Sequence, residues 1–137
     1  MRRAAILAGL SVVLVSCAPQ KTAGPLENTS WRLVTLVNQG LGVPPKDAPT
    51  MAIKNAVASG FGGCNGYSMV LTVYGTVVTF GAVTRVQQPC SMAATKLENE
   101  FFRALIGAAR AQIDGDTLIL REQTGKERAR FKRISAP

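Results

Sequence analysis

The chain has 137 residues, with 16 Lys and Arg against 8 Asp and Glu, and it contains no His. The absence of His excludes His-based nucleophile pairs and His-liganded zinc. A hydrophobic fraction of 47% with 18% charged residues argues against a disordered chain and for a folded core, and the length fits one domain.

The first 16 residues are typical of an export signal. Arg2 and Arg3 precede an apolar run over residues 4–13, which is too short for a membrane-spanning helix because a span takes roughly 20 apolar residues. The segment Leu14-Val15-Ser16-Cys17 resembles the lipobox of bacterial lipoproteins, in which the Cys is acylated and becomes the N-terminus. We therefore expect residues 1–16 to be a signal peptide and Cys17 to carry lipid; the alternative is a plain signal peptide.

The basic charge persists after this processing. Residues 1–16 hold 2 of the 16 basic side chains, so 14 remain against 8 acidic ones, a net charge of 14 − 8 = +6. In the cytosol this balance would suggest nucleic acid. An exported chain meets envelope polyanions instead, such as lipid head groups, so we expect no nucleic-acid partner. A charge that serves only solubility is the alternative.

The N-terminal part of the remaining chain predicts a tether and then a strand. Residues 17–27 hold two Pro and a Gly and few side chains that pack, which is typical of a linker. Alternation over residues 29–37 predicts a strand with Trp31, Leu33, Thr35 and Val37 on one face. We expect Trp31, the only Trp, to anchor the core, since a lone aromatic cannot form a cation-binding cage.

The centre of the chain predicts short strands separated by turns. Residues 40–49 hold three Pro and two Gly and predict a loop, and two short strands follow between residues 51 and 61. Runs rich in β-branched residues at 70–73 and 77–80 flank Tyr74-Gly75-Thr76, a hairpin turn. Residues 81–89 have no clear period and predict irregular structure.

The period then changes to about 3.6 between Ser91 and Ala109, which predicts an amphipathic helix with Ser91 as its N-cap and Gly107 near its end. Its apolar stripe consists of Leu97, Phe101, Ala104, Leu105 and Ala108.

Two more strands are predicted at residues 117–122 and 127–134, joined by a turn at 123–125. Strands, one helix and strands again favour the α+β class with an antiparallel sheet over a βαβ alternation.

A family resemblance rests on five segments in a fixed order. The segment Gly60-Phe61-Gly62-Gly63-Cys64-Asn65-Gly66-Tyr67 resembles the G-x-x-G-C-N-x-Y signature of META domains, the family of the heat-shock lipoprotein HslJ. Asn28 to Leu33, which includes Trp31, resembles the family's opening strand, and Thr84-Arg85 resembles its T-R pair. Glu98 to Leu105, which includes Phe101, resembles its E-x-x-F-x-x-A-L helix, and Gly115 to Leu120 resembles its G-x-x-L-x-L strand.

The resemblance implies a small, partly open antiparallel β-barrel with one packed α-helix over residues 28–134, in an envelope protein without an assigned reaction. Family members are linked to stress response, antibiotic tolerance, virulence or secretion. One departure concerns the second Cys, which follows the Arg of the T-R pair by about three residues in the family, whereas Arg85 and Cys90 are five apart here.

With Cys17 acylated, Cys64 and Cys90 remain as an even pair in an oxidising compartment, where a structural disulfide is the default. Its loop of about 27 residues would contribute about 3 to 3.5 kcal/mol in the loop-entropy treatment. The alternative is a redox function at these thiols, although no C-x-x-C spacing is present. A metal site would need carboxylates beside two Cys, and those are sparse, so we expect none.

Two further residue patterns do not predict a functional site. The glycines of residues 60–66 lack the Lys-Ser/Thr of a phosphate loop and are explained by turns. Glu98 and Glu100 cannot act as an acid-base pair, because residues two apart on a helix point in different directions.

The last predicted strand is the most charged element. Alternation places Arg128, Arg130 and Lys132 on one face and Ala129 and Phe131 on the other. The charged face either blocks edge-to-edge pairing of sheets or binds anions.

These observations predict a monomeric, non-enzymatic lipoprotein without a cofactor, which acts in stress response or envelope maintenance by binding a protein or an anionic surface. Ala18 after the Cys favours, by resemblance to known lipoproteins, the periplasmic face of the outer membrane. The alternatives are a thiol redox protein using Cys64 and Cys90, and an inhibitor of a lysozyme-type hydrolase. Like-charge repulsion between a basic chain and a basic lysozyme weighs against the inhibitor.

Overall fold

The computed structural model describes residues 23–37 and 46–135; the expected signal peptide and the lipidation site Cys17 lie outside them. Within the described residues the chain forms a short 3₁₀ helix, eight strands and one α-helix. In chain order these are η1 (Gly24–Leu26), β1 (Thr29–Leu36), β2 (Thr50–Lys54), β3 (Val57–Phe61), β4 (Gly66–Tyr74), β5 (Val77–Arg85), α1 (Met92–Ile106), β6 (Arg110–Asp114), β7 (Thr117–Arg121) and β8 (Glu127–Ile134).

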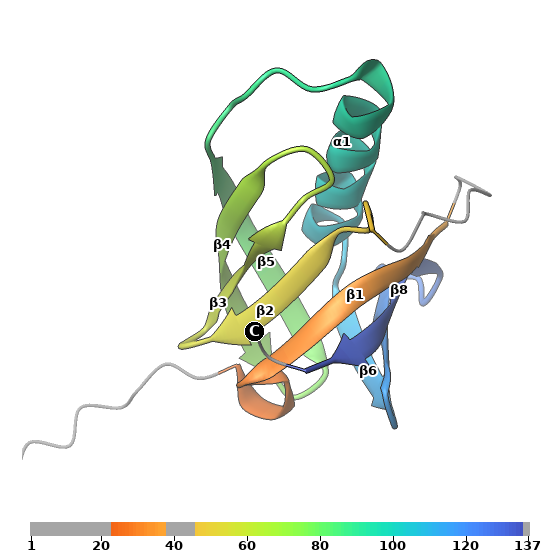
Figure 1. The fold of residues 1–137 in the computed structure, drawn as a ribbon. Helices are drawn as coiled ribbons and strands as arrows, with labels where there is room; N and C mark the ends of the chain where they lie inside the picture. The colour runs from red at the N-terminus through yellow and green to blue at the C-terminus, as the bar shows by residue number, and fades with distance from the viewer. Residues whose placement is uncertain (1–22, 38–45, 136–137) are drawn as a thin grey trace, which may run out of the picture.

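The strands pair antiparallel in chain order, and β8 returns to β1, so that the sheet closes on itself as a barrel (Figure 1). The closure is uneven. In the described residues β5 and β6 share one residue pair, Val77 with Arg110, whereas β4 and β5 pair along most of their length. The helix α1 connects β5 to β6. The predicted α+β class, with a partly open antiparallel barrel and one helix, is confirmed.

Alternate side chains of the strands point into the barrel and meet one face of α1. Trp31 is fully buried, as predicted, and its Nε1 donates a hydrogen bond to Thr29 Oγ1 at 2.7 Å. Full burial of one such large side chain contributes about 1.5 to 3 kcal/mol. The predicted helical stripe is confirmed, because Phe101, Ala104, Leu105 and Ala108 are buried and Leu97 packs against them.

The ends of α1 follow the predicted capping residues. The Ser91 hydroxyl accepts a hydrogen bond from the Ala94 amide at 3.2 Å, which satisfies one of the free donors of the first turn. Gly107 follows the last turn, and its amide bonds to the Arg103 carbonyl. Among the described residues no helix has the length and apolar character needed to cross a membrane.

The alternation predicted for residues 29–37 is wrong in its second half. A β-bulge shifts the register between Leu33 and Thr35, where β1 pairs with β8. Thr35 is therefore exposed and Leu36 is buried, the reverse of the prediction. A bulge adds one residue to one strand, so every side chain after it changes face.

Two regular segments were missed. Residues 81–85, predicted as irregular, continue β5, because a bulge between Met69 and Leu71 keeps the hairpin paired past Gly81. Residues 110–114 form β6, whose alternation is visible only in the half-buried Ala111 and Ile113 between polar neighbours.

The predicted tether is too long at its C-terminal end. Ala23 and Leu26 are buried in the core, and Pro25 lies in the first turn of η1, where its missing amide costs no hydrogen bond. Glu27 ties this segment to the turn between β2 and β3, because its carboxylate accepts hydrogen bonds from the amides of Ala23 at 2.8 Å and Asn55 at 2.5 Å. The packed domain thus begins by Ala23.

We expect acid to release this N-terminal attachment. The amide of Ala23, then those of Asn55 and Ala56, hold the pKa of Glu27 below its ordinary value of 4.5. A carboxylate with a lowered pKa stabilises the fold above 4.5, and this contribution is lost as the pH falls through the folded value. The amide signals of Asn55 and Ala56 should shift together in NMR spectra below pH 4.5. Glu27→Gln should lack this transition, and a transition that persists in this variant would assign it to another group.

Candidate functional site

The signature segment forms the connection between β3 and β4 and lies directly against α1. A Cβ atom on Gly62 would lie 2.8 Å from Phe102 Cζ, and one on Gly63, whose φ is +115°, would lie 3.1 Å from Leu97 Cγ. Glycine is needed at both positions because the loop backbone approaches the helix too closely for a side chain. The two glycines therefore bring the loop amides within reach of the helix.

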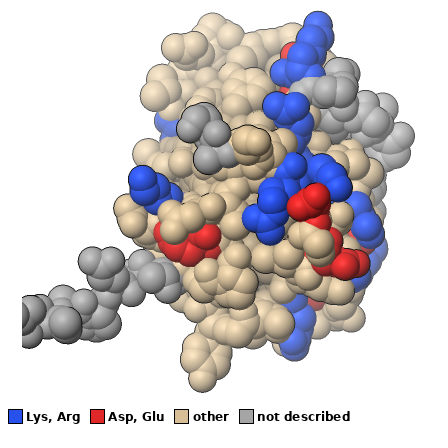
Figure 2. All heavy atoms as spheres, turned by 60° about the horizontal axis from the view of Figure 1, so that its bottom comes forward, with Lys and Arg blue, Asp and Glu red and all other residues tan. Residues whose placement is uncertain are grey.

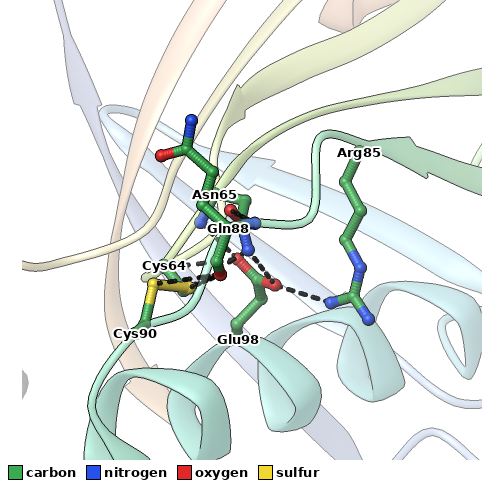
Figure 3. Close-up of polar contacts among 6 residues, drawn as sticks. All are labelled: Cys64, Asn65, Arg85, Gln88, Cys90 and Glu98. Atoms are coloured by element: carbon green, nitrogen blue, oxygen red, sulfur yellow. Dashed lines mark hydrogen bonds and ion pairs between the residues drawn. A yellow bond between two sulfur atoms is a disulfide. The ribbon is translucent and has the colours of Figure 1, made fainter.

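The carboxylate of Glu98, on α1, accepts hydrogen bonds from those loop amides (Figure 3). Glu98 is 2% exposed, and its carboxylate accepts four hydrogen bonds in all. Oε2 accepts from the backbone amides of Cys64 at 3.2 Å and Asn65 at 2.5 Å, and Oε1 accepts from Asn65 Nδ2 at 3.1 Å and Arg85 Nη1 at 2.6 Å. Two bonds per oxygen use the lone pairs of the carboxylate. Glu98 thus joins the loop, the helix and the end of β5.

Asn65 extends the network to the segment that precedes the helix. Its Oδ1 accepts a hydrogen bond from the Gln88 amide at 2.9 Å. Beside it Cys64 and Cys90 form a disulfide, with 6.0 Å between their Cα atoms. The predicted disulfide is confirmed, and the longer spacing from Arg85 to Cys90 does not prevent it. The segment before α1 is therefore fixed at both Gln88 and Cys90.

The remaining signature residue, Tyr67, points into the core. Its ring packs edge-to-face on Phe101 and Phe102, with centroid distances of 5.5 and 5.2 Å. Its hydroxyl donates to the Thr50 carbonyl at 3.0 Å. Burial raises the pKa of Tyr67, which keeps the hydroxyl protonated as a donor. Tyr67 thus couples β4 to β2 beneath the loop.

Of the other residues of the resemblance, Thr84 and Trp31 lie outside this network and Arg85 lies within it. Thr84 is exposed and pairs with Ser68 across the β4–β5 hairpin. Trp31 lies beneath the Arg133 guanidinium, which is 4.4 Å from its ring centroid. Arg85 belongs to the network, and it also lies 5.5 Å from the centroid of the Phe102 ring.

The role of Glu98 was not predicted from the sequence. A signal for it was present, because Glu98 precedes Phe101 by three residues and so shares the buried face of the helix. A carboxylate on a buried face needs donors from elsewhere in the fold. Which donors they are depends on the loop from β3, whose position the helical pattern does not contain.

Ala129 and Phe131 of β8 are buried, and Arg130 and Lys132 lie on the opposite face. Arg128 differs from the prediction, because it lies at a register shift between β7 and β8 and its Nη2 donates to the Arg103 carbonyl at the end of α1, at 3.1 Å. The charges of β8 are partly neutralised within the chain. Arg128 pairs with Glu122 at 3.1 Å and Arg130 with Glu127 at 2.8 Å, and the hydrogen bonds that Arg130 donates to the Glu127 carboxylate raise the pKa of Arg130. Lys132 is 4.0 Å from Asp116, and both side chains are largely exposed. Carboxylates accordingly interrupt the basic surface in Figure 2.

Residues 23–37 and 46–135 contain no group of three Cys, Asp or Glu side chains placed to hold a metal ion.

The close approach at the start of the signature predicts a strong substitution effect. A Cβ atom on Gly60 would overlap the Thr50 carbonyl oxygen, which belongs to the backbone of a paired strand and cannot move away freely. We expect Gly60→Ala to lower the free energy of unfolding by about 2 kcal/mol in urea titrations. Gly66→Ala is the matched control, since its Cβ meets nothing closer than 3.8 Å and should change stability by less than about 0.5 kcal/mol. Equal effects of the two substitutions would contradict this explanation.

Similar folds occur in solved structures. A protein from Burkholderia xenovorans, solved by NMR, is 21% identical with a TM-score of 0.69, and the match covers 96% of this chain and 100% of that one. A second NMR structure is 19% identical with a TM-score of 0.63, covering 81% and 93%. A DUF4847 family protein from Bacteroides vulgatus, a crystal structure, is 17% identical with a TM-score of 0.58, covering 82% and 97%. At these identities the likeness concerns the fold alone.

No curated protein matches the chain. The profile of the META domain family matches residues 24–135, which include the signature loop, Glu98 and both cysteines of the disulfide. The chain therefore belongs to the META domain family.

Proposed function

We propose that this protein is a non-enzymatic lipoprotein of the bacterial envelope, anchored through lipid on Cys17, which acts in envelope maintenance or stress response by binding at its surface. The outer membrane, with the domain in the periplasm, is the proposed location, and the monomer is the proposed state.

The observation that carries this proposal is that the polar groups of the signature residues form hydrogen bonds with one another and that the two cysteines are joined in a disulfide. Glu98 has four donors, Asn65 bonds on both sides of its amide, and the thiols of Cys64 and Cys90 are joined. Groups held in this way stabilise a fold, whereas a catalytic acid, base or nucleophile needs a free face toward its substrate. The disulfide also supports an oxidising compartment, which agrees with export.

Anchoring can be tested with the full-length chain expressed in a two-membrane bacterium. We expect mass spectrometry to find the chain starting at Cys17 with acyl groups attached, and fractionation to recover it with outer membranes. Cys17→Ser should abolish acylation, while Cys64→Ser, which removes a different cysteine, should leave it intact. Recovery of the unprocessed, unacylated chain from the soluble fraction would contradict the proposal.

Trapping of mixed disulfides distinguishes a thiol redox function from a structural disulfide. A redox protein attacks its partner with one cysteine and releases it with the other, so Cys90→Ser or Cys64→Ser would accumulate mixed disulfides. A structural disulfide predicts no such adducts on non-reducing gels of alkylated cells, and both thiols of the wild type should remain unlabelled. Adducts that appear with one single-Cys variant and not with the other would favour the redox alternative.

A further inference from the structure

A groove of about 460 Å³ lies on the barrel surface over β8, β1, β2 and β3. Its floor follows one transverse row of the sheet, in which Ser30 pairs with Ile134 and with Ala52, and Ala52 pairs with Ser59. Small side chains at three neighbouring positions leave the sheet surface hollow there. The side chain of Arg32, two residues along β1, lines the same groove.

Arg32 is an exposed cation beside a second cation. It is directly opposite Lys132 in the β1–β8 register, so both side chains leave the same face of the sheet on neighbouring strands. Like charges in this relation destabilise a sheet. Among residues 23–37 and 46–135, Lys132 has only the distant contact with Asp116, and Arg32 forms no ion pair with any carboxylate. The pair is thus open to an external anion.

Ser30 contributes a hydroxyl group to the lining of the groove. Ser59 and Ser135 line the same groove. The groove therefore offers a guanidinium together with several hydroxyl donors.

We propose that this groove binds a phosphate group, with Arg32 as the principal contact and Ser30 and Lys132 as supporting donors. A phosphate suits the site better than a carboxylate because its oxygens accept more hydrogen bonds than the two oxygens of a carboxylate, and because Arg binds phosphate through two parallel N–H groups.

Ser30 and Arg32, which line the groove, lie near the start of β1. β1 follows η1 directly, where the described chain enters the barrel from its N-terminal side (Figure 1). Five residues lie between Cys17 and Ala23, so the six steps along the chain span at most about 20 Å. If Cys17 is acylated, as the proposed function holds, phospholipid head groups are the nearest phosphates. A phosphate ester free in solution is the other source of the same chemistry.

The experiment uses the ¹⁵N-labelled full-length product purified from membranes in zwitterionic micelles. Glycerol 1-phosphate is titrated in one arm, and nanodiscs of phosphatidylglycerol or phosphatidylcholine replace the micelles in the other. We expect saturable shifts of the amides of Ser30, Ala52 and Ser59 and of the Arg32 Nε–H signal. Arg32→Gln should weaken binding at least about tenfold. Lys96→Gln, which removes one exposed positive charge from α1, should not weaken it.

A groove-filling variant, Ser59→Leu, changes no charge and should weaken binding as well. Saturation by glycerol 1-phosphate assigns the site to free phosphate esters, and a response only to phosphatidylglycerol nanodiscs assigns it to the lipid surface. No saturable response in either arm, or equal weakening by Arg32→Gln and Lys96→Gln, overturns the proposal. The titration with glycerol 1-phosphate tests phosphate binding in the groove, and mass spectrometry of the same sample tests acylation of Cys17. Failure of the groove proposal can therefore be distinguished from failure of the proposed function.

Discussion

Replacing Glu98 with Ala is expected to be the most damaging single substitution in the signature network, with a loss of about 3 to 5 kcal/mol in the free energy of unfolding. The loss arises because two backbone amides, the side-chain amide of Asn65 and the guanidinium of Arg85 lose their common acceptor together. Donors buried without a partner carry their full desolvation cost. Urea denaturation followed by Trp31 fluorescence measures the change, since Trp31 is fully buried.

Glu100→Ala is the matched control on the same helix. Glu100 pairs with Arg103 at 2.7 Å, but the Arg103 side chain is 67% exposed, so water replaces the lost contact. A loss of less than about 1 kcal/mol is expected. If the two substitutions destabilise the protein equally, Glu98 does not have the organising role assigned to it.

Removing the disulfide is expected to cost about 3 to 3.5 kcal/mol, because the unfolded chain regains the freedom of a loop closed between Cys64 and Cys90. The double variant Cys64→Ser/Cys90→Ser should show this loss in urea relative to the oxidised wild type. The reduced wild type, which keeps the native side chains, should match the double variant. Equal midpoints for oxidised and reduced protein would show that the disulfide contributes nothing to stability.

The Glu98 and disulfide effects are not expected to add. Cys64 belongs to both, since its amide donates to Glu98 and its sulfur is bonded to Cys90. Residues that share a network show coupling energies of about 0.5 to 3 kcal/mol. The reduced Glu98→Ala protein should therefore be more stable than the sum of the two losses implies, because the loop has already been released by the first change.

Local periodicity was enough to predict much of the fold. The helix with its Ser91 cap, the burial of Trp31 and the burial of Ala129 and Phe131 in β8 each follow from a pattern within one segment, and each is confirmed. Where pairing partners decide the outcome, the same patterns failed. The bulge after Leu33 depends on the register with β8, and β6 depends on neighbours that complete its half-buried face.

The candidate site was likewise predictable from the sequence only in part. The oxidising compartment implied by the export signal was enough to pair Cys64 with Cys90. The acceptor role of Glu98 was not predictable, because its donors lie 33 and 34 residues away on the loop from β3, and its Arg partner at the end of β5. The alternation of residues 29–37 places Arg32 on the face opposite Trp31 and contains nothing about its neighbours on other strands. The proximity of Arg32 to Lys132 arises from the closure of the sheet between β1 and β8.

The weak connection between β5 and β6 gives the signature network a further consequence. One residue pair joins these strands, and α1, which Glu98 and the disulfide hold in place, is the segment between them. If the helix detached, β5 and β6 would separate, and the barrel would open with free backbone amides and carbonyls along both strands. Unpaired edges of this kind recruit other chains and lead to aggregation. Loss of Glu98 or the disulfide should then appear in cells as insoluble protein, before the population of fully unfolded chains becomes large.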